Sequence, residues 1–150
     1  MHRGILVLLV SIACAQAGLS ELEAISMIES GNNDRAIGGA GEVSRYQIMP
    51  RVWKTYTSSR AYQNTEVSRK IAQKHLAYLE SLFQNKTGRP PSDFDRYVLW
   101  NAGPTYYARV GFAAARVHPV IRERARRYVN LREMPDPEPP QGMLAVGILR

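Results

Sequence analysis

The sequence predicts a mainly α-helical single domain that carries one small irregular or β element. Serine residues stand where helices would begin, and glycine or proline residues stand where they would end. The chain has 150 residues, which is enough for one domain with a hydrophobic core. The segment from about 65 to 88 is amphipathic at helical spacing, with an apolar stripe formed by Val67, Ile71, Tyr78, Leu79 and Leu82.

Residues 1–17 have the pattern of a secretory signal peptide. A basic start at His2 and Arg3 is followed by an apolar run from Ile5 to Ala13. The run is too short to span a membrane, and Ala15-Gln16-Ala17 has the small-x-small pattern of a cleavage site. We therefore expect an exported protein, periplasmic or associated with the cell wall, that is cleaved after Ala17.

The cysteine content and the net charge indicate which covalent links and which binding partners to expect. Cys14 is the only cysteine and lies in the leader, so the mature chain would hold no disulfide. A lipoprotein signal ending at Cys14 is the alternative, although Ser11-Ile12-Ala13 lacks the usual leucine three residues before that cysteine. The net charge of +7 suits an anionic polymer, and a bacterial wall polymer is one. We expect no nucleic-acid partner, no cofactor or metal, and a monomer; association with secretion or cell-wall machinery stays open.

The first half of the chain predicts two helices around a loop. Ser20-Glu21-Leu22-Glu23 is a capping box, which predicts a helix from about Glu21 to Ser30. The segment 32–43 is rich in Asn, Asp and Gly, as loops are. Residues 46–49 suit a short strand or turn, and Pro50 suits the first turn of a helix that contains Val52 and Trp53.

The second half predicts further helices and then a linker. His75 lies on the apolar stripe of the long helix and is interpreted as a core residue without a role. Ser92 caps a helix that runs toward Gly103, Pro104 begins another around 106–110, and Pro119 begins a last one. Residues 135–150 are a stiff Pro-rich linker followed by a short apolar tail, so the domain is expected over 18–134.

Glu29 is the candidate catalytic residue. Leu22, Ile25 and Glu29 are spaced at i, i+3 and i+7, so they share one face of a helix. Removal of water from a glutamate in line with apolar residues disfavours its charged form and raises its pKa. A carboxyl that stays protonated near neutral pH can act as a general acid. The alternative is a glutamate that only caps the helix or extends to solvent.

Two blocks of residues resemble a known family. Glu29-Ser30-Gly31, Asn33, Ala36, Gly41 and Gln47-Ile48-Met49-Pro50 are similar in order and spacing to the first signature of the soluble lytic transglycosylases, which are relatives of goose-type lysozyme. Leu99-Trp100-Asn101-Ala102-Gly103 resembles the second signature, and the resemblance runs from about Leu19 to Glu133. Two departures are visible: Ser44-Arg45-Tyr46 replaces the usual Gly-Leu-Met, and Trp100 replaces the usual Tyr.

The resemblance implies a lysozyme-like fold and a reaction. The reaction is cleavage of the MurNAc-β-1,4-GlcNAc bond of peptidoglycan without water, which leaves 1,6-anhydro-MurNAc ends. By position in the motifs, Glu29 is the only catalytic carboxylate. Substrate-binding roles are implied for five residues: amide groups from Gln47 and Asn101, a cleft wall from Met49, a stacking face from Trp100, and a hydroxyl from Tyr128 that orients the catalytic carboxyl.

Other interpretations stay open. A second carboxylate from the Asp34–Glu42 loop near Glu29 would favour a muramidase, which uses water. A catalytically inactive glycan-binding module is the third class, although Glu29, Gln47 and Asn101 are all present. Trp100 and Tyr128 also suit core positions, and Asn101 suits a helix C-terminus. The basic cluster of the last helix is interpreted as a solvated face; it contains Arg122, Arg124, Arg126 and Arg127.

Overall fold

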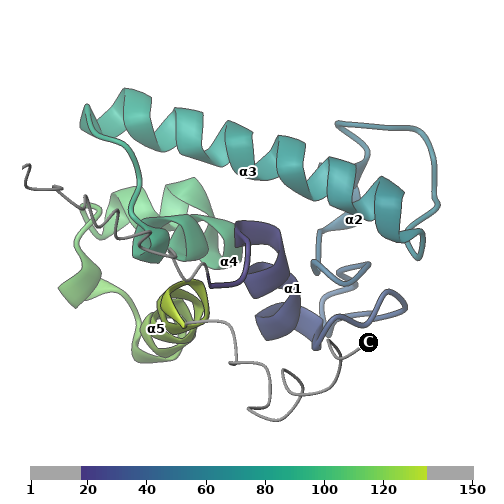
Figure 1. Cartoon of the computed structure of the whole chain (residues 1–150). Coiled ribbons are helices and arrows are strands. Elements are labelled where there is room, and N and C mark those ends of the chain that lie inside the picture. Colours follow the sequence, from purple (N-terminus) through teal and green to yellow (C-terminus); the bar gives the residue numbers. More distant parts are fainter. Residues whose placement is uncertain (1–17, 135–150) are drawn as a thin grey trace, which may run out of the picture.

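The computed structural model describes residues 18–134, and the fold is mainly helical, as predicted (Figure 1). The long helix α3 runs along one side of the molecule, and α4 contacts both α3 and α5. Helix α1 contacts α5 and α3. The predicted leader (1–17) and the predicted linker and tail (135–150) lie outside the described residues. The elements are α1 (Glu21–Ser30), α2 (Pro50–Trp53), α3 (Thr65–Thr87), α4 (Asp93–Arg109), the 3₁₀ helix η1 (Ala114–Arg116) and α5 (Pro119–Glu133).

Helix α1 has the ends that its sequence predicts. The Ser20 hydroxyl accepts a hydrogen bond from the Glu23 backbone N–H, and the Glu23 carboxylate accepts one from the Ser20 backbone N–H at 2.9 Å. Gly31 ends the helix with φ of 63°, a left-handed conformation that costs glycine little. These caps fix where α1 stops, and they place Glu29 in its last turn.

Helix α4 contains a break at the predicted place. Ser92 and Asp95 form a capping box at its start. Gly103 has non-helical backbone angles (φ 80°, ψ 162°), and Pro104 follows it, so α4 consists of two helical segments that meet at a kink. The first segment carries Trp100 and Asn101 next to this kink.

The small β element is confirmed as a pair of single bridges in the loop between α1 and α2. Val43 pairs in antiparallel fashion with both Ile37 and Ile48. Ser44 and Gln47 adopt positive φ angles of 68° and 50°, which are uncommon for residues other than glycine. The bridges therefore close a tight turn that projects the Gln47 side chain from a fixed backbone.

Aromatic residues dominate the core between the helices. The largest fully buried side chains are Trp53, Tyr97, Tyr107, Tyr128 and Phe83. The predicted stripe of α3 is partly correct: Ile71 and Leu79 are buried, whereas Tyr78 is 53% exposed and lies at the rim of a cavity.

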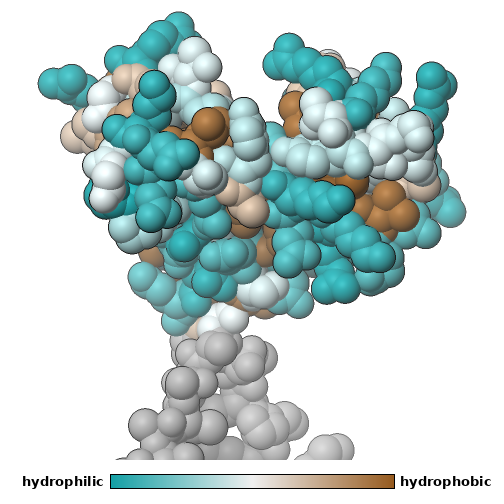
Figure 2. All heavy atoms as spheres, turned by 90° about the horizontal axis from the view of Figure 1, so that it is seen from above, coloured by the Kyte–Doolittle hydropathy of each residue, from teal (hydrophilic) through white to brown (hydrophobic). Residues whose placement is uncertain are grey.

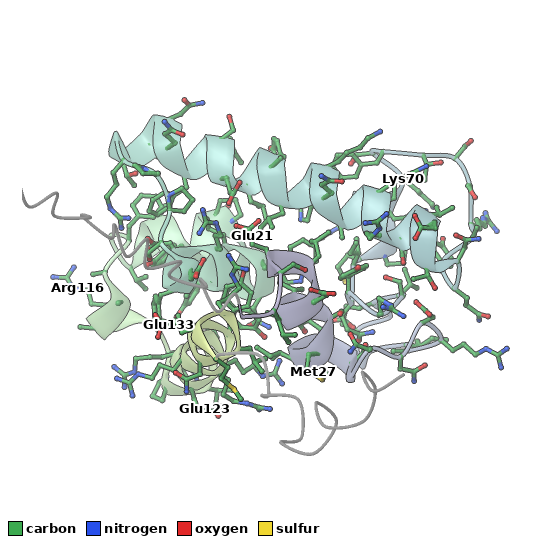
Figure 3. All side chains as sticks on the ribbon, in the orientation of Figure 1. Glu21, Met27, Lys70, Arg116, Glu123 and Glu133 are labelled. Carbon is green, nitrogen blue, oxygen red and sulfur yellow. The ribbon has the colours of Figure 1, made fainter. Side chains whose placement is uncertain are left out.

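The surface is mostly polar. Hydrophilic side chains cover most of the face shown in Figure 2, where small hydrophobic areas lie apart from one another and a notch separates two lobes. Charged side chains such as Lys70, Arg116, Glu123 and Glu133 point outward (Figure 3). Within residues 18–134 no helix is both long enough and apolar enough to cross a membrane.

Candidate active site

Glu29 lies in the last turn of α1 and faces α4. The Tyr97 hydroxyl donates a hydrogen bond to Glu29 Oε1 at 2.8 Å, and Asn101 Nδ2 approaches the same oxygen at 3.4 Å. Tyr97 and Asn101 are four residues apart on α4, so one helix face presents both donors. Both donors are neutral, and no ion pair of Glu29 occurs in residues 18–134.

Burial sets the electrostatics of this carboxyl. Removal from water raises the pKa of Glu29 above its ordinary value of 4.5. The hydrogen bonds from Tyr97 and Asn101 and the charge of Arg124 oppose this rise, and the charge of Glu42 adds to it. The net pKa is raised, as the sequence predicts, so the carboxyl holds its proton to a higher pH than an exposed glutamate does.

The carboxyl opens into a polar cavity of about 280 Å³. Four parts of the chain build it: α1, the loop before α2, α4 and α5. Because these parts are distant in sequence, the cavity depends on the whole fold. Its lining residues are Glu29, Gly38, Gly39, Glu42, Gln47, Trp100, Asn101 and Arg124.

Gly38 lies close to two polar side chains of this cavity. A Cβ atom there would collide with the Glu42 carboxylate and with Gln47 Oε1. The Ala40 backbone N–H donates to Glu42 Oε2 at 2.9 Å, and Gln47 Nε2 donates to the Ser44 carbonyl at 3.0 Å. The loop backbone therefore holds both polar side chains in place beside Glu29.

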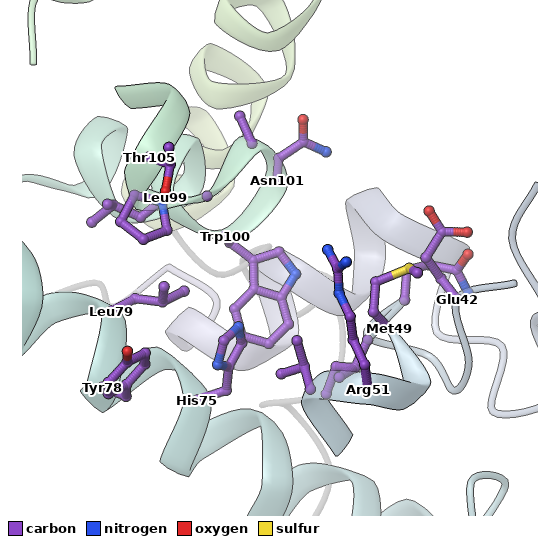
Figure 4. Close-up of a pocket in the computed structure, with 16 residues that line it drawn as sticks. Glu42, Met49, Arg51, His75, Tyr78, Leu79, Leu99, Trp100, Asn101 and Thr105 are labelled. Carbon is purple, nitrogen blue, oxygen red and sulfur yellow. The ribbon is translucent and has the colours of Figure 1, made fainter. Parts of the chain in front are cut away.

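A second cavity of about 430 Å³ adjoins the first and shares four lining residues with it: Glu42, Gln47, Trp100 and Asn101. Trp100 lies at its centre between His75 of α3 and the α2 region that carries Met49 and Arg51 (Figure 4). Trp100 Nε1 donates to the Tyr46 carbonyl at 3.3 Å, which fixes the indole ring. The two cavities form one groove with a polar end at Glu29 and an aromatic end at Trp100.

His75 is partly buried among aromatic side chains that include Trp100. Its ring lies 5.4 Å from the Trp100 ring between centroids, and its Nδ1 is 3.1 Å from the Tyr56 hydroxyl. Burial lowers the pKa of His75, so the imidazole is neutral near pH 7. The residue thus lines the aromatic end of the groove, although the sequence predicts no role for it.

The structure brings most of the predicted site residues together. Glu29, Gln47, Trp100 and Asn101 line one cavity, and Met49 lines the adjoining one. The structure does not bring Tyr128 into either cavity, and its position fits the alternative of a core residue. Its side chain is fully buried, so it cannot touch a substrate, and its hydroxyl has no hydrogen-bond partner in the described part of the chain.

Tyr97 orients the Glu29 carboxyl in place of Tyr128. The Tyr97 and Tyr128 rings pack together with centroids 5.5 Å apart, so Tyr128 supports the residue that donates to Glu29. The sequence holds one signal for Tyr97: it precedes Asn101 by four residues, and both therefore share a helix face. The carboxyl therefore accepts from a tyrosine of α4, whereas the Tyr128 hydroxyl of α5 has no partner within residues 18–134.

The two acidic residues of the loop differ in position. Asp34 forms a bidentate ion pair with Arg45, at 2.6 and 2.8 Å, and accepts a hydrogen bond from Thr65 at 2.9 Å. These contacts hold the Asp34 carboxylate outside the Glu29 cavity. Glu42 instead lines both cavities and faces Glu29 closely enough to affect its pKa.

Arg124 is a site residue that the sequence analysis assigned to a solvated face. Arg126 and Arg127 are exposed, as predicted, whereas Arg124 is half-buried and lines the Glu29 cavity. Arg124 and Tyr128 are one turn apart on α5, so the face of α5 that packs on α4 also carries Arg124.

Comparisons with protein-family models, curated proteins and solved structures give no match to this chain. Residues 18–134 contain no cluster of His, Cys, Asp or Glu side chains placed to hold a metal ion. The functional argument therefore depends on the geometry and chemistry of the groove itself.

Proposed function

We propose that the protein is a peptidoglycan lytic transglycosylase. The observation that carries the proposal is the half-buried Glu29 carboxyl, which has a raised pKa and lies at the polar end of a groove lined by the half-buried Trp100 ring. A protonated carboxyl beside a sugar-sized groove suits acid-catalysed cleavage of a glycosidic bond. The resemblance of the two signature blocks specifies the bond as MurNAc-β-1,4-GlcNAc.

The first step uses Glu29 as an acid. The carboxyl gives its proton to the glycosidic oxygen while the bond from that oxygen to C1 of the muramyl sugar breaks. The N-acetyl group of the substrate stabilises the positive charge that develops at C1. Glu29 becomes a carboxylate, and Tyr97 and Asn101 then donate to it, which stabilises the charge that the transfer creates.

The second step uses the same residue as a base. The Glu29 carboxylate takes the proton of the C6 hydroxyl of the muramyl sugar, and the C6 oxygen bonds to C1. A 1,6-anhydro ring closes, no water is consumed and Glu29 is protonated again. Because the attacking hydroxyl belongs to the same sugar, the step is intramolecular and avoids the entropic cost of a bimolecular attack.

Gln47, Asn101 and Trp100 position the strand in this scheme. Their amides and indole face line the groove beside Glu29 and supply hydrogen bonds and an apolar plane. Met49 contributes an apolar wall beside Trp100 (Figure 4).

A hydrolytic muramidase is the second candidate, and Glu42 is the observation that favours it. Its carboxylate lies in the Glu29 cavity and is held there by the Ala40 backbone N–H. An inverting glycosidase needs a second carboxylate to activate water on the opposite side of the sugar. The two candidates predict different products and different effects of Glu42→Gln.

Mass spectrometry of peptidoglycan fragments tests the proposal. We expect fragments that end in 1,6-anhydro-MurNAc, are lighter by one water than muramidase products, and resist borohydride reduction. We expect Glu42→Gln to leave these products unchanged. Reducible muramic acid ends as the main product, lost in Glu42→Gln, would replace the transglycosylase with the muramidase. An absence of cleavage by wild-type protein would favour the glycan-binding module.

A further inference from the structure

Arg124 differs from its neighbours on α5 in what surrounds its side chain. Arg126 is exposed, and Arg122 donates a hydrogen bond to the Ala115 carbonyl at 3.3 Å. Arg124 is instead half-buried and lines the cavity that holds the Glu29 carboxyl. Within residues 18–134 its guanidinium forms no ion pair. A cation without a carboxylate partner of its own therefore lies beside the candidate acid.

Glu42 brings the opposite charge into the same cavity. It comes from the loop before α2, where the Ala40 backbone N–H donates to its carboxylate at 2.9 Å, and it too forms no ion pair within residues 18–134. The remaining titratable group that faces Glu29 is the Tyr97 hydroxyl of α4, and among the described residues α3 contributes none to this cavity. Glu29 thus has one cation from α5 and one anion from the loop as neighbours.

These two charges act on Glu29 in opposite directions. Against the rise that burial causes, the Arg124 charge lowers the pKa of Glu29, and the Glu42 charge raises it further. Charges interact more strongly in a cavity partly shielded from water than on an open surface. The proposed reaction requires Glu29 to give up a proton and then to take one, so neither its acid form nor its carboxylate can be strongly favoured.

We propose that Arg124 and Glu42 are opposed positioning residues for the two proton transfers of Glu29. Arg124 stabilises the carboxylate that exists between the two steps, and Glu42 stabilises the protonated form that begins the cycle. The neutral donors Tyr97 and Asn101 orient the carboxylate, whereas Arg124 supplies the positive charge that they lack. The inference rests on the proposed function, because it assigns roles within that reaction.

Arg124→Gln tests the role of the cation on a soluble peptidoglycan oligomer. At acid pH, where Glu29 is protonated in both proteins, we expect kcat to fall about tenfold, the scale of one charge-assisted interaction, with little change in KM. The loss of rate at high pH should move to higher pH, because the pKa of Glu29 rises when the positive charge is removed. Arg124→Lys keeps the charge and should retain the wild-type pH profile.

Glu42→Gln tests the anion and should move the same loss of rate to lower pH, while the products keep their anhydro ends. The charge control is Arg126→Gln, because Arg126 is exposed on the same helix and lines neither cavity of the groove. This control should leave kcat and the pH profile in place. A purely structural role of Arg124 would lower the melting temperature of Arg124→Gln without moving the profile of its folded fraction.

Two results would overturn the inference while anhydro ends still supported the proposed function. One is a pH profile that stays in place in both Arg124→Gln and Glu42→Gln. The other is a raised KM with unchanged kcat in Arg124→Gln, which would make Arg124 a ligand of the substrate. If Arg124→Gln does not fold, the profile of Glu42→Gln decides: a move to lower pH supports the inference, and no move overturns it. Failure of the wild-type protein to cleave the oligomer would remove the proposed function, and the inference with it.

Discussion

Glu29 and Asp95 are both shielded from water, and each accepts a hydrogen bond from a tyrosine of α4, yet their pKa values move in opposite directions. Asp95 is 3% exposed and accepts from the Tyr107 hydroxyl at 2.6 Å. Burial raises the pKa of both carboxyls. For Asp95 the hydrogen bonds outweigh burial and its pKa falls below 3.8, whereas for Glu29 burial prevails and the pKa rises above 4.5.

The number and charge of the donors explain the difference. Asp95 also accepts from the Arg89 guanidinium at 2.7 Å and from both the backbone N–H and the hydroxyl of Ser92 at 2.8 and 2.7 Å. Within residues 18–134, Glu29 has only two side-chain donors, both neutral and one of them at 3.4 Å. Burial alone therefore does not raise the pKa of a carboxyl. The pKa rises where a buried carboxyl accepts few hydrogen bonds. Asp95 stabilises the start of α4, whereas Glu29 holds its proton to a higher pH than an exposed glutamate does.

Glu29→Gln gives the largest effect. The amide has the same shape and still accepts from Tyr97, but it cannot give and retake a proton. We expect cleavage to fall by at least ~10²–10⁴-fold, the usual contribution of general acid–base catalysis. Turnover of purified peptidoglycan measures it. Near-wild-type turnover would show that Glu29 is not the acid.

The same variant should not lose stability. Because the folded-state pKa of Glu29 is raised, its favourable contribution is complete below the unfolded value of 4.5 and is lost as pH rises through the folded value. A neutral amide avoids that loss, so the melting temperature of Glu29→Gln near pH 7 should equal or exceed the wild-type value.

Asp95→Asn should have the opposite profile. It removes a charge from a carboxylate that a guanidinium and three neutral donors hold, so we expect the free energy of unfolding to fall by about 2 kcal/mol. Urea unfolding at pH 7 measures this loss, and activity per folded molecule should be retained. Asp95 contributes fully above the unfolded value of 3.8 and less as pH falls through the folded value, so the two proteins should converge in stability in acid. A constant difference at all pH values would show that the charge of Asp95 is not responsible.

Local sequence signals predicted the helices well. The capping box at Ser20 and Glu23, the left-handed glycine at position 31 and the break at Gly103-Pro104 all act within a few residues. Interactions of this range can be identified in a single sequence, because the chain itself brings the groups together.

The site was less predictable because its details depend on how helices face one another. Helical spacing puts Tyr97 on the same face as Asn101, and Arg124 on the same face as Tyr128, but it does not show which face of α4 or α5 meets Glu29. The choice between Tyr97 and Tyr128 as the donor follows from long-range packing. The site residues inferred from the signature blocks line the groove. The carboxyl-orienting hydroxyl that was expected from Tyr128 of α5 comes instead from Tyr97 of α4.

Gln47→Ala and Asn101→Ala test whether these two residues act in the site or only stabilise the fold. Both amides line the groove rather than the core, so we expect activity to fall by about tenfold, near the value of one or two hydrogen bonds, with little loss of stability. Parallel rate and melting measurements check this. A collapsed melting temperature with full activity in the remaining folded protein would make the two residues structural.

Tyr97→Phe and Tyr128→Phe are a matched pair with the smallest expected effects. The acid must be protonated, so the rate falls as pH rises through the pKa of Glu29. The Tyr97 hydroxyl lowers that pKa, and its removal should move this fall to higher pH. The Tyr128 hydroxyl has no partner in residues 18–134, so Tyr128→Phe should leave the profile in place. An equal shift in both variants would disprove the assigned role of Tyr97.

The most direct measurement is a carbon NMR titration of the Glu29 and Asp95 side-chain carboxyls in the same folded protein. We predict that Glu29 titrates above 4.5 and Asp95 below 3.8. Assignment through Glu29→Gln and Asp95→Asn identifies the two signals. A Glu29 signal that titrated at or below 4.5 would contradict the claim that burial keeps this carboxyl protonated for catalysis.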